Sequence, residues 1–169
     1  MPTDLTIPHH GDAALWQHRP LLGLCSSRRH PAGALLPTAQ WAIAQREAGV
    51  GVVSGFQTPL ERAALRYLLA PVLHGGGMAP PVVWVLATGL WQRPYPAPVQ
   101  AALAAGRLLV LAPVGAARLT QASALARTRW VLAECPGPVL VPWATPGGAL
   151  AGVLAGVLAG AGPGRWMEA

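Results

Sequence analysis

One short segment, residues 52–62, has the residue types and spacing of an anion-binding loop. A small polar turn, Ser54 and Gly55, comes directly after a run of apolar residues. Thr58 is suited to cap a following helix, the proline after it fits the first helical position, and Glu61 completes a capping box. A helix that begins there points its free N–H groups and the positive end of its dipole at the loop. The segment therefore predicts a site for a phosphate or a carboxylate.

The elements that position this loop follow from an alternation of short apolar runs with helix-length segments. The apolar runs predict strands at 20–25, 50–53, 81–86, 107–111 and 138–142. Helices are expected at 34–48, 59–69, just before Gly106, 119–134 and 148–160. Continuous apolar strands that alternate with helices are typical of a parallel sheet covered on both faces. We predict a Rossmann-like α/β domain with three layers and a mostly parallel sheet of about five or more strands.

The 169-residue chain is long enough for one sizeable core. Residues 1–19 are polar and aperiodic, so we expect a flexible N-terminal arm there. The single domain is expected over residues 20–162, and residues 163–169 are expected to form a C-terminal tail.

Four of the predicted turns directly follow strands, at 25–29, 54–58, 87–89 and 144–148. Ligands of parallel sheets bind beyond the carboxyl ends of the strands, so these turns should gather at one edge. The helix before the last strand adds two arginines. The predicted phosphate- or nucleic-acid-binding residues are Ser26, Ser27, Arg28, Arg29, Ser54, Gly55, Phe56, Gln57, Thr58, Thr88, Gly89, Arg127, Arg129, Thr145, Gly147 and Gly148.

Composition favours an anionic partner and gives no sign of a metal or another cofactor. The net charge is +6, while only 11% of the residues are charged and 53% are apolar, so much of the chain must be buried. The histidines and cysteines have no zinc-finger or ribbon spacing. Because no secretory signal is evident, we interpret Cys25 and Cys135 as thiols of a cytoplasmic protein.

The stretch between Glu134 and Arg165 contains no charged residue. Prolines interrupt its first half, and the helical remainder is shorter than the roughly 20 residues that a bilayer requires, so we expect no membrane span. Glycines recur at every fourth position from Gly148 to Gly160. One face of this apolar helix should lie on the sheet, and the other would meet either a second subunit, in a homodimer, or another helix. The alternative is an Ala/Gly-rich tail produced by compositional bias.

Taken together, five segments resemble the short proteins related to DNA-processing protein A (DprA/Smf). They are Cys25 to Arg28, Ser54 to Glu61, Gly106 to Pro113, Arg127 to Arg129 and Thr145 to Gly148. The resemblance covers roughly residues 20 to 160. It implies the Rossmann-like fold of a nucleotide- and DNA-binding superfamily that also contains the LOG phosphoribohydrolases and the molybdenum-cofactor carrier proteins. DprA itself binds single-stranded DNA, dimerises and helps to load recombinase.

The chain departs from that family pattern at two motifs. Of the long-form motif Ser-Gly-x-Ala-x-Gly-Ile-Asp it keeps only Ser54 and Gly55. In the motif that normally reads Arg-Asn-Arg, Thr128 replaces the asparagine.

The leading hypothesis is a DprA-like protein that binds single-stranded nucleic acid without turnover. The four arginines of the predicted site would pair with phosphates, and Phe56 or Trp91 would offer a stacking face. The alternatives stay open: Arg28 and Arg29 are merely solvated, Arg127 and Arg129 cover the sheet or pair with an acid, and Phe56 is part of the core.

Two other functions remain. A nucleotide sensor or carrier would hold a phosphate with the hydroxyls of Ser26, Ser54 and Thr58. A LOG-like phosphoribohydrolase is the third hypothesis, but residues 149–152, directly after Gly147 and Gly148, contain no carboxylate, and we interpret Glu61 as a helix cap. We therefore expect binding rather than catalysis.

Overall fold

The computed structural model of the protein describes residues 6–72, 79–158 and 166–168. Seven strands form one sheet in the order β1-β5-β4-β3-β2-β6-β7. The β1 strand is antiparallel to β5, and all other neighbouring strands are parallel. The strands are β1 (His9–His10), β2 (Leu21–Leu24), β3 (Gly51–Ser54), β4 (Val82–Val85), β5 (Leu108–Leu111), β6 (Val139–Val141) and β7 (Trp166–Glu168).

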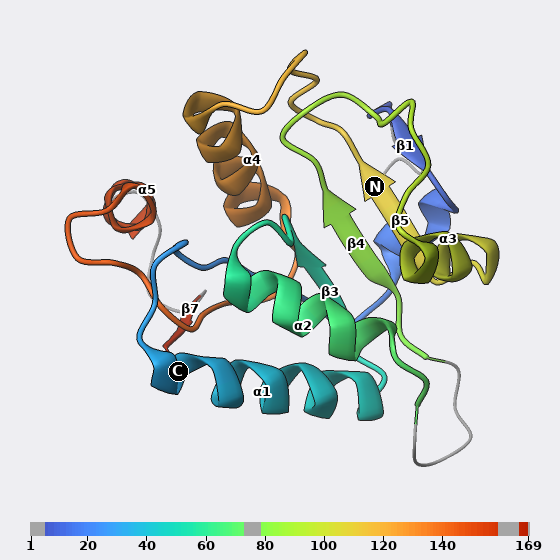
Figure 1. The fold of residues 1–169 in the computed structure, drawn as a ribbon, viewed down its shortest axis with the longest axis horizontal. Helices are drawn as coiled ribbons and strands as arrows, with labels where there is room; N and C mark the ends of the chain where they lie inside the picture. Colours follow the sequence, from blue (N-terminus) through green and yellow to red (C-terminus); the bar gives the residue numbers. More distant parts are fainter. Residues whose placement is uncertain (1–5, 73–78, 159–165, 169) are drawn as a thin grey trace.

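Helices cover both faces of this sheet, which gives the three predicted layers. Figure 1 shows α2 in front of β3, with α1 beside it. One buried cluster joins the sheet to α1, α2 and α3, and a second joins it to α4 and α5. The helices are α1 (Leu35–Glu47), α2 (Pro59–Leu69), α3 (Ala97–Ala104), α4 (Gln121–Glu134) and α5 (Ala149–Leu158), with short 3-10 helices η1 (Ala13–Gln17) and η2 (Ala32–Ala34).

The strands β4 and β5 are apolar at every position because both of their faces are buried. On β5, Leu108 and Val110 join the core under α1 to α3, whereas Leu109 and Leu111 join the core under α4 and α5. Successive side chains of a strand point to opposite faces, so a strand between two helical layers needs a continuous apolar run. The predicted α/β architecture with a mostly parallel sheet is confirmed.

Part of the expected N-terminal arm is ordered against the sheet, which corrects the prediction of a flexible arm for this part. His9 and His10 pair with β5, and the Ala112 N–H donates to the Pro8 carbonyl at 2.9 Å. Asp12 caps η1, and the ring of Trp16 packs against that of Trp130 with centroids 5.5 Å apart. Backbone pairing and aromatic burial thus order a segment whose composition is polar. At the other end of the chain, β7 pairs with β6 in a region expected to be a tail.

The strand order reverses between β2 and β6. From β2 the chain adds β3, β4 and β5 on one side of the sheet and then returns to place β6 on the other side. Loops that leave two such strands diverge and open a crevice at the carboxyl ends of the strands. The loops after β2 and β6 therefore flank the place where a ligand is expected.

The α5 helix packs on the sheet through one face only. Leu150 and Val153 are buried in the core shared with α4. Gly152 and Gly156 are exposed, and a Cβ atom added at either would meet nothing within 4 Å. The expected sheet-facing side is confirmed, whereas Gly160 lies outside the described residues. Among the described residues, no helix is long and apolar enough to cross a membrane.

Candidate nucleic-acid interface

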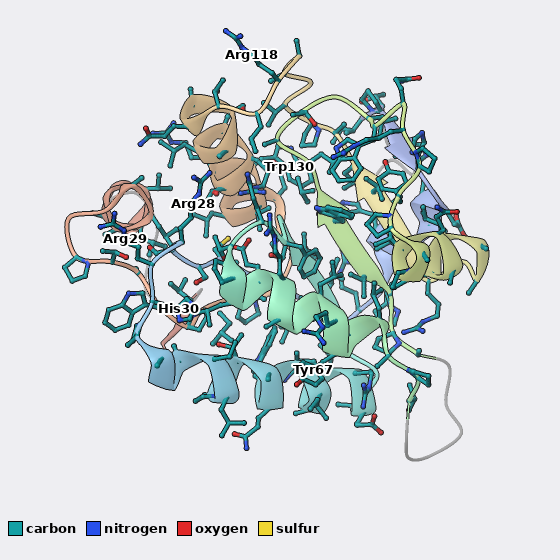
Figure 2. The ribbon with its side chains drawn as sticks, in the orientation of Figure 1. Arg28, Arg29, His30, Tyr67, Arg118 and Trp130 are labelled. Atoms are coloured by element: carbon teal, nitrogen blue, oxygen red, sulfur yellow. The ribbon has the colours of Figure 1, made fainter. Side chains whose placement is uncertain are left out.

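The loop after β2 has a buried base and an exposed charged tip. Ser26 and Ser27 are buried, whereas Arg28 and Arg29 are exposed. Figure 2 shows both arginines on the segment that leads from the sheet toward α1. The loop therefore presents two guanidinium groups to solvent from a buried support.

The loop after β6 is hydrogen-bonded to this support across the switch point. The Ser27 N–H donates to the Trp143 carbonyl, and the Thr145 N–H donates to the Ser27 hydroxyl, each at 2.9 Å. The Thr145 hydroxyl donates to the Arg29 carbonyl at 3.0 Å. Gly147, at φ 68°, turns the chain toward α5 in a conformation that favours glycine. The structure thus brings the predicted residues of these two loops together.

Glu61 connects the loops after β2 and β3. One carboxylate oxygen accepts a hydrogen bond from the Ser26 N–H at 2.9 Å. The other oxygen accepts hydrogen bonds from the backbone N–H groups of Gln57 at 2.8 Å and Thr58 at 3.2 Å. The Thr58 hydroxyl accepts from the Glu61 N–H, so the predicted capping box is confirmed. The side chain is only 3% exposed, and both of its oxygens hold backbone N–H groups. We interpret Glu61 as a positioning group for the two loops.

Phe56 belongs to the core, as the alternative interpretation held. Its ring is 3% exposed and packs in the cluster under α1 to α3. Its φ of 45° lies in the left-handed region, which is costly for a bulky residue, and the Ser54 hydroxyl accepts from its N–H at 3.2 Å. This conformation keeps the ring inside while the backbone turns toward α2, so the exposed stacking face expected of Phe56 is not present.

The two arginines predicted on α4 lie in different surroundings. Arg129 is exposed, whereas Arg127 is 6% exposed and lies over Gly55, where a Cβ atom would overlap its guanidinium. No hydrogen bond or ion pair joins that guanidinium to another part of the described chain. Between them, the Thr128 hydroxyl donates to the Ala124 carbonyl within the helix. Arg127 thus closes the space that the missing side chain of Gly55 leaves.

A cavity of about 770 Å³ lies between α2 and the loop from β4 to α3. Trp84 supports it from the sheet, and its indole N–H donates to the Gly55 carbonyl at 2.9 Å. Trp91 stacks on Tyr95 with centroids 5.2 Å apart and meets Trp84 edge-on at 5.3 Å. Among the lining residues are five of the predicted site, namely Gly55, Phe56, Gln57, Thr88 and Arg127.

The predicted site is therefore divided between two places at the strand ends. The loops of Ser26–Arg29 and Thr145–Gly148 form a surface at the switch point, and none of their residues lines the cavity. Gly89 belongs to neither place, and its N–H donates a hydrogen bond to the Ala116 carbonyl at 3.0 Å. The prediction had not included Arg62, Arg66 and Arg93, which also line the cavity. The four-residue spacing of the first two on α2 was the signal that could have found them.

Within residues 6–72, 79–158 and 166–168, the thiols and histidines show no sign of reactive or metal-binding chemistry. Cys25 and Cys135 are buried, and burial together with the negative charge of Glu61 raises the pKa of the Cys25 thiol. In the part of the chain that the structure describes, no cluster of three potential metal ligands occurs. The functional groups at the strand ends are arginine side chains, hydroxyls and backbone N–H groups.

Comparisons with known proteins give a consistent fold and no sequence match. No protein-family model matches the chain, and no curated protein matches it. DNA processing protein A from Helicobacter pylori, solved for its single-stranded DNA binding mode, superposes with a TM-score of 0.67 at 19% identity, over 87% of this chain and 64% of that one. The Streptococcus pneumoniae protein gives 0.55 at 21% identity, over 79% of this chain and 44% of that one.

The present chain spans less than two thirds of the length of either solved chain. The superpositions nevertheless cover 87% and 79% of the present chain. The chain has the α/β fold of DNA processing protein A.

Proposed function

We propose that this protein binds single-stranded DNA through the sugar-phosphate backbone, at the switch point between β2 and β6, and that it does so without turnover. The observation that carries the proposal is the pair of loops there, which are hydrogen-bonded to each other. Hydrogen bonds from Thr145 hold the loop of Arg28 and Arg29, whose side chains extend into solvent. The guanidinium group matches phosphate geometry and stays charged at all relevant pH values.

Two further facts support a nucleic-acid backbone as the ligand. The net charge of +6 attracts polyanions over distances longer than contact. The Helicobacter protein with the same fold binds single-stranded DNA. The turn at Gly147 and Gly148 lies beside the arginine loop and leads into α5. The Gly148 N–H donates to the Thr145 carbonyl at 2.9 Å, so the N–H groups at the start of α5 are the ones that suit a phosphate oxygen.

The double replacement of Arg28 and Arg29 by alanine tests this surface. We expect the affinity for a labelled single-stranded oligonucleotide, measured by fluorescence anisotropy, to fall about tenfold at low salt. The slope of log affinity against log salt should become shallower by about 1.4, because each lost phosphate contact on a single strand contributes roughly 0.7.

Arg19→Ala is the matched control. Arg19 is an exposed arginine that precedes β2, so it lies at the opposite end of that strand from Arg28. Its replacement should leave affinity and salt slope close to wild type. Arg19→Ala removes one charge and the double variant removes two. A loss of log affinity in Arg19→Ala that is half of the loss in the double variant would therefore show that net charge alone drives binding. No binding by the wild type at low salt would end the proposal.

Two other functions receive different support. A nucleotide ligand is favoured by the cavity between α2 and the β4–α3 loop, where aromatic rings and arginines meet. Phosphoribohydrolase chemistry receives less support, because both carboxylate oxygens of Glu61 accept hydrogen bonds from backbone N–H groups. We therefore propose binding alone.

We also propose that the chain forms a homodimer through the outward face of α5. Gly152 and Gly156 leave that face flat and exposed in the single chain. Light scattering should give twice the 17.5 kDa chain mass. Gly152→Gln should shift the protein to monomer, whereas Ala133→Gln, on the exposed side of α4, should not. Wild-type protein that remains monomeric at all concentrations would exclude this dimer.

The proposed compartment is the cytoplasm. Cys25 and Cys135 are both free thiols, as is usual for proteins of a reducing compartment. Nucleic acid is also available there as a partner.

A further inference from the structure

The cavity between α2 and the β4–α3 loop combines an aromatic support with a concentration of positive charge. Its arginines come from three elements: Arg62 and Arg66 from α2, Arg93 from the β4–α3 loop, and Arg127 from α4. None of the described residues that line the cavity is acidic. Such a site attracts an anion, and its volume suits a ligand of the size of one nucleotide.

Arg127 is the strongest sign of an anionic ligand. The residue is 6% exposed, yet no acid or carbonyl of the described chain pairs with its guanidinium. A buried cation without a partner is costly, whereas one that faces a cavity can be neutralised by a bound anion. Gly55 lets the guanidinium lie directly on the backbone of the β3–α2 loop, and both residues line the cavity.

Trp91 shows where a planar group would lie. One side of its ring is stacked on Tyr95, at an interplanar angle of 15°. The guanidinium of Arg93 lies over the Trp91 ring, 4.4 Å from the centroid. A flat, delocalised group therefore already lies on this ring, and Arg93 is exposed and able to move aside or to stack on a further ring.

We propose that this cavity binds one nucleotide unit, with the base on Trp91 and the phosphate between Arg127 and the arginines of α2. The ligand is a planar aromatic ring that carries a phosphate. It comes either from a free mononucleotide or from one nucleotide of a bound strand. Binding of a free mononucleotide does not depend on the switch-point surface, since no residue of that surface lines the cavity. Binding of one nucleotide of a DNA strand rests on the proposed function.

Calorimetry with deoxyadenosine monophosphate tests the free ligand. We expect saturable binding, with affinities at least tenfold lower for deoxyadenosine and for inorganic phosphate, because each lacks one half of the recognised group. Trp91→Leu and Arg62→Ala should each weaken binding by roughly tenfold, the loss that follows removal of a stacking face or of a charge-assisted contact. Arg127→Gln should weaken it further.

Arg118→Ala is the matched control for charge. Arg118 is exposed on the loop before α4, does not line the cavity and points away from the molecule in Figure 2, so its loss should not change binding. Thermal melts establish that each variant is folded. Arg62 is exposed, so the Arg62→Ala protein remains informative even when Arg127→Gln fails to fold.

The same variants distinguish the two sources of the nucleotide. A free mononucleotide site is supported when deoxyadenosine monophosphate binds and the Arg28 and Arg29 double variant still binds it. A strand subsite is supported when Trp91→Leu and Arg62→Ala weaken oligonucleotide binding while mononucleotides do not bind. The proposal is overturned when folded Trp91→Leu and Arg62→Ala proteins bind both ligands as the wild type does, or when the wild type binds neither.

Discussion

Replacement of Glu61 by alanine is expected to lower the free energy of unfolding by about 3 to 5 kcal/mol, because it leaves three backbone N–H groups without their charged acceptor. Those groups belong to Ser26, Gln57 and Thr58, and the first lies 35 residues from Glu61 in the sequence. The loop of Arg28 would lose one of its anchors together with the cap of α2. We therefore expect DNA affinity to fall as well, even in the fraction that remains folded.

Chemical denaturation followed by circular dichroism measures this cost. Glu61→Gln keeps the shape and one carbonyl oxygen, so it should cost roughly half as much as the alanine variant. Glu134→Ala removes the same charge from an exposed position on α4 and should change stability by less than about 0.5 kcal/mol. A Glu61→Ala protein as stable as the Glu134→Ala protein would contradict the role of Glu61 as the connection between the two loops.

Replacement of Gly55 by alanine is expected to cost about 2 to 3 kcal/mol of stability and to remove nucleotide binding in the cavity. The physical reason is space, because the added Cβ atom would overlap the guanidinium of Arg127. That guanidinium is nearly buried, and it has to leave its place over the loop. The phosphate would then lose the group that we expect to hold it.

Gly33→Ala provides the matched control, because a Cβ atom at Gly33 meets nothing within 4 Å. Its stability and its affinity for deoxyadenosine monophosphate should stay close to wild type. The double variant Gly55→Ala with Arg127→Ala should recover part of the stability lost in Gly55→Ala, since the overlapping side chain is gone. Additive losses in the double variant would show that the two residues do not interact.

The elements of the fold were largely predictable because their signals are local. The apolar runs at β3 and β5, the capping residues of α2 and the glycine that ends α3 all act within a few residues of themselves. The two-residue strand β1 was not predictable, since His9 and His10 are polar and have no periodicity of their own. Its strand conformation comes from the backbone partners that β5 supplies.

The candidate site was predictable in part. Parallel strands place their following loops at one edge, so the sequence alone pointed to the loops at Ser26 and Thr145. It did not show that these two loops bond to each other while Gly55 and Thr88 face a separate cavity. That division depends on strand order, which pattern and spacing do not encode.

Residue types and short-range spacing therefore determined the α/β class, the capped start of α2 and the placing of arginines beside strand-end loops. The tertiary structure decided the rest. It alone showed that Glu61 reaches the Ser26 N–H, that Arg127 lies on Gly55 and that Trp84, Trp91 and Tyr95 form one aromatic group. Each of the first two contacts joins residues of different elements, and such contacts arise only once the order of the strands has set which loops are neighbours. For the same physical reason, the capping box could be predicted from the sequence, because its residues lie within one helical turn. The cavity could not be predicted, because it is formed between elements that are distant in the chain.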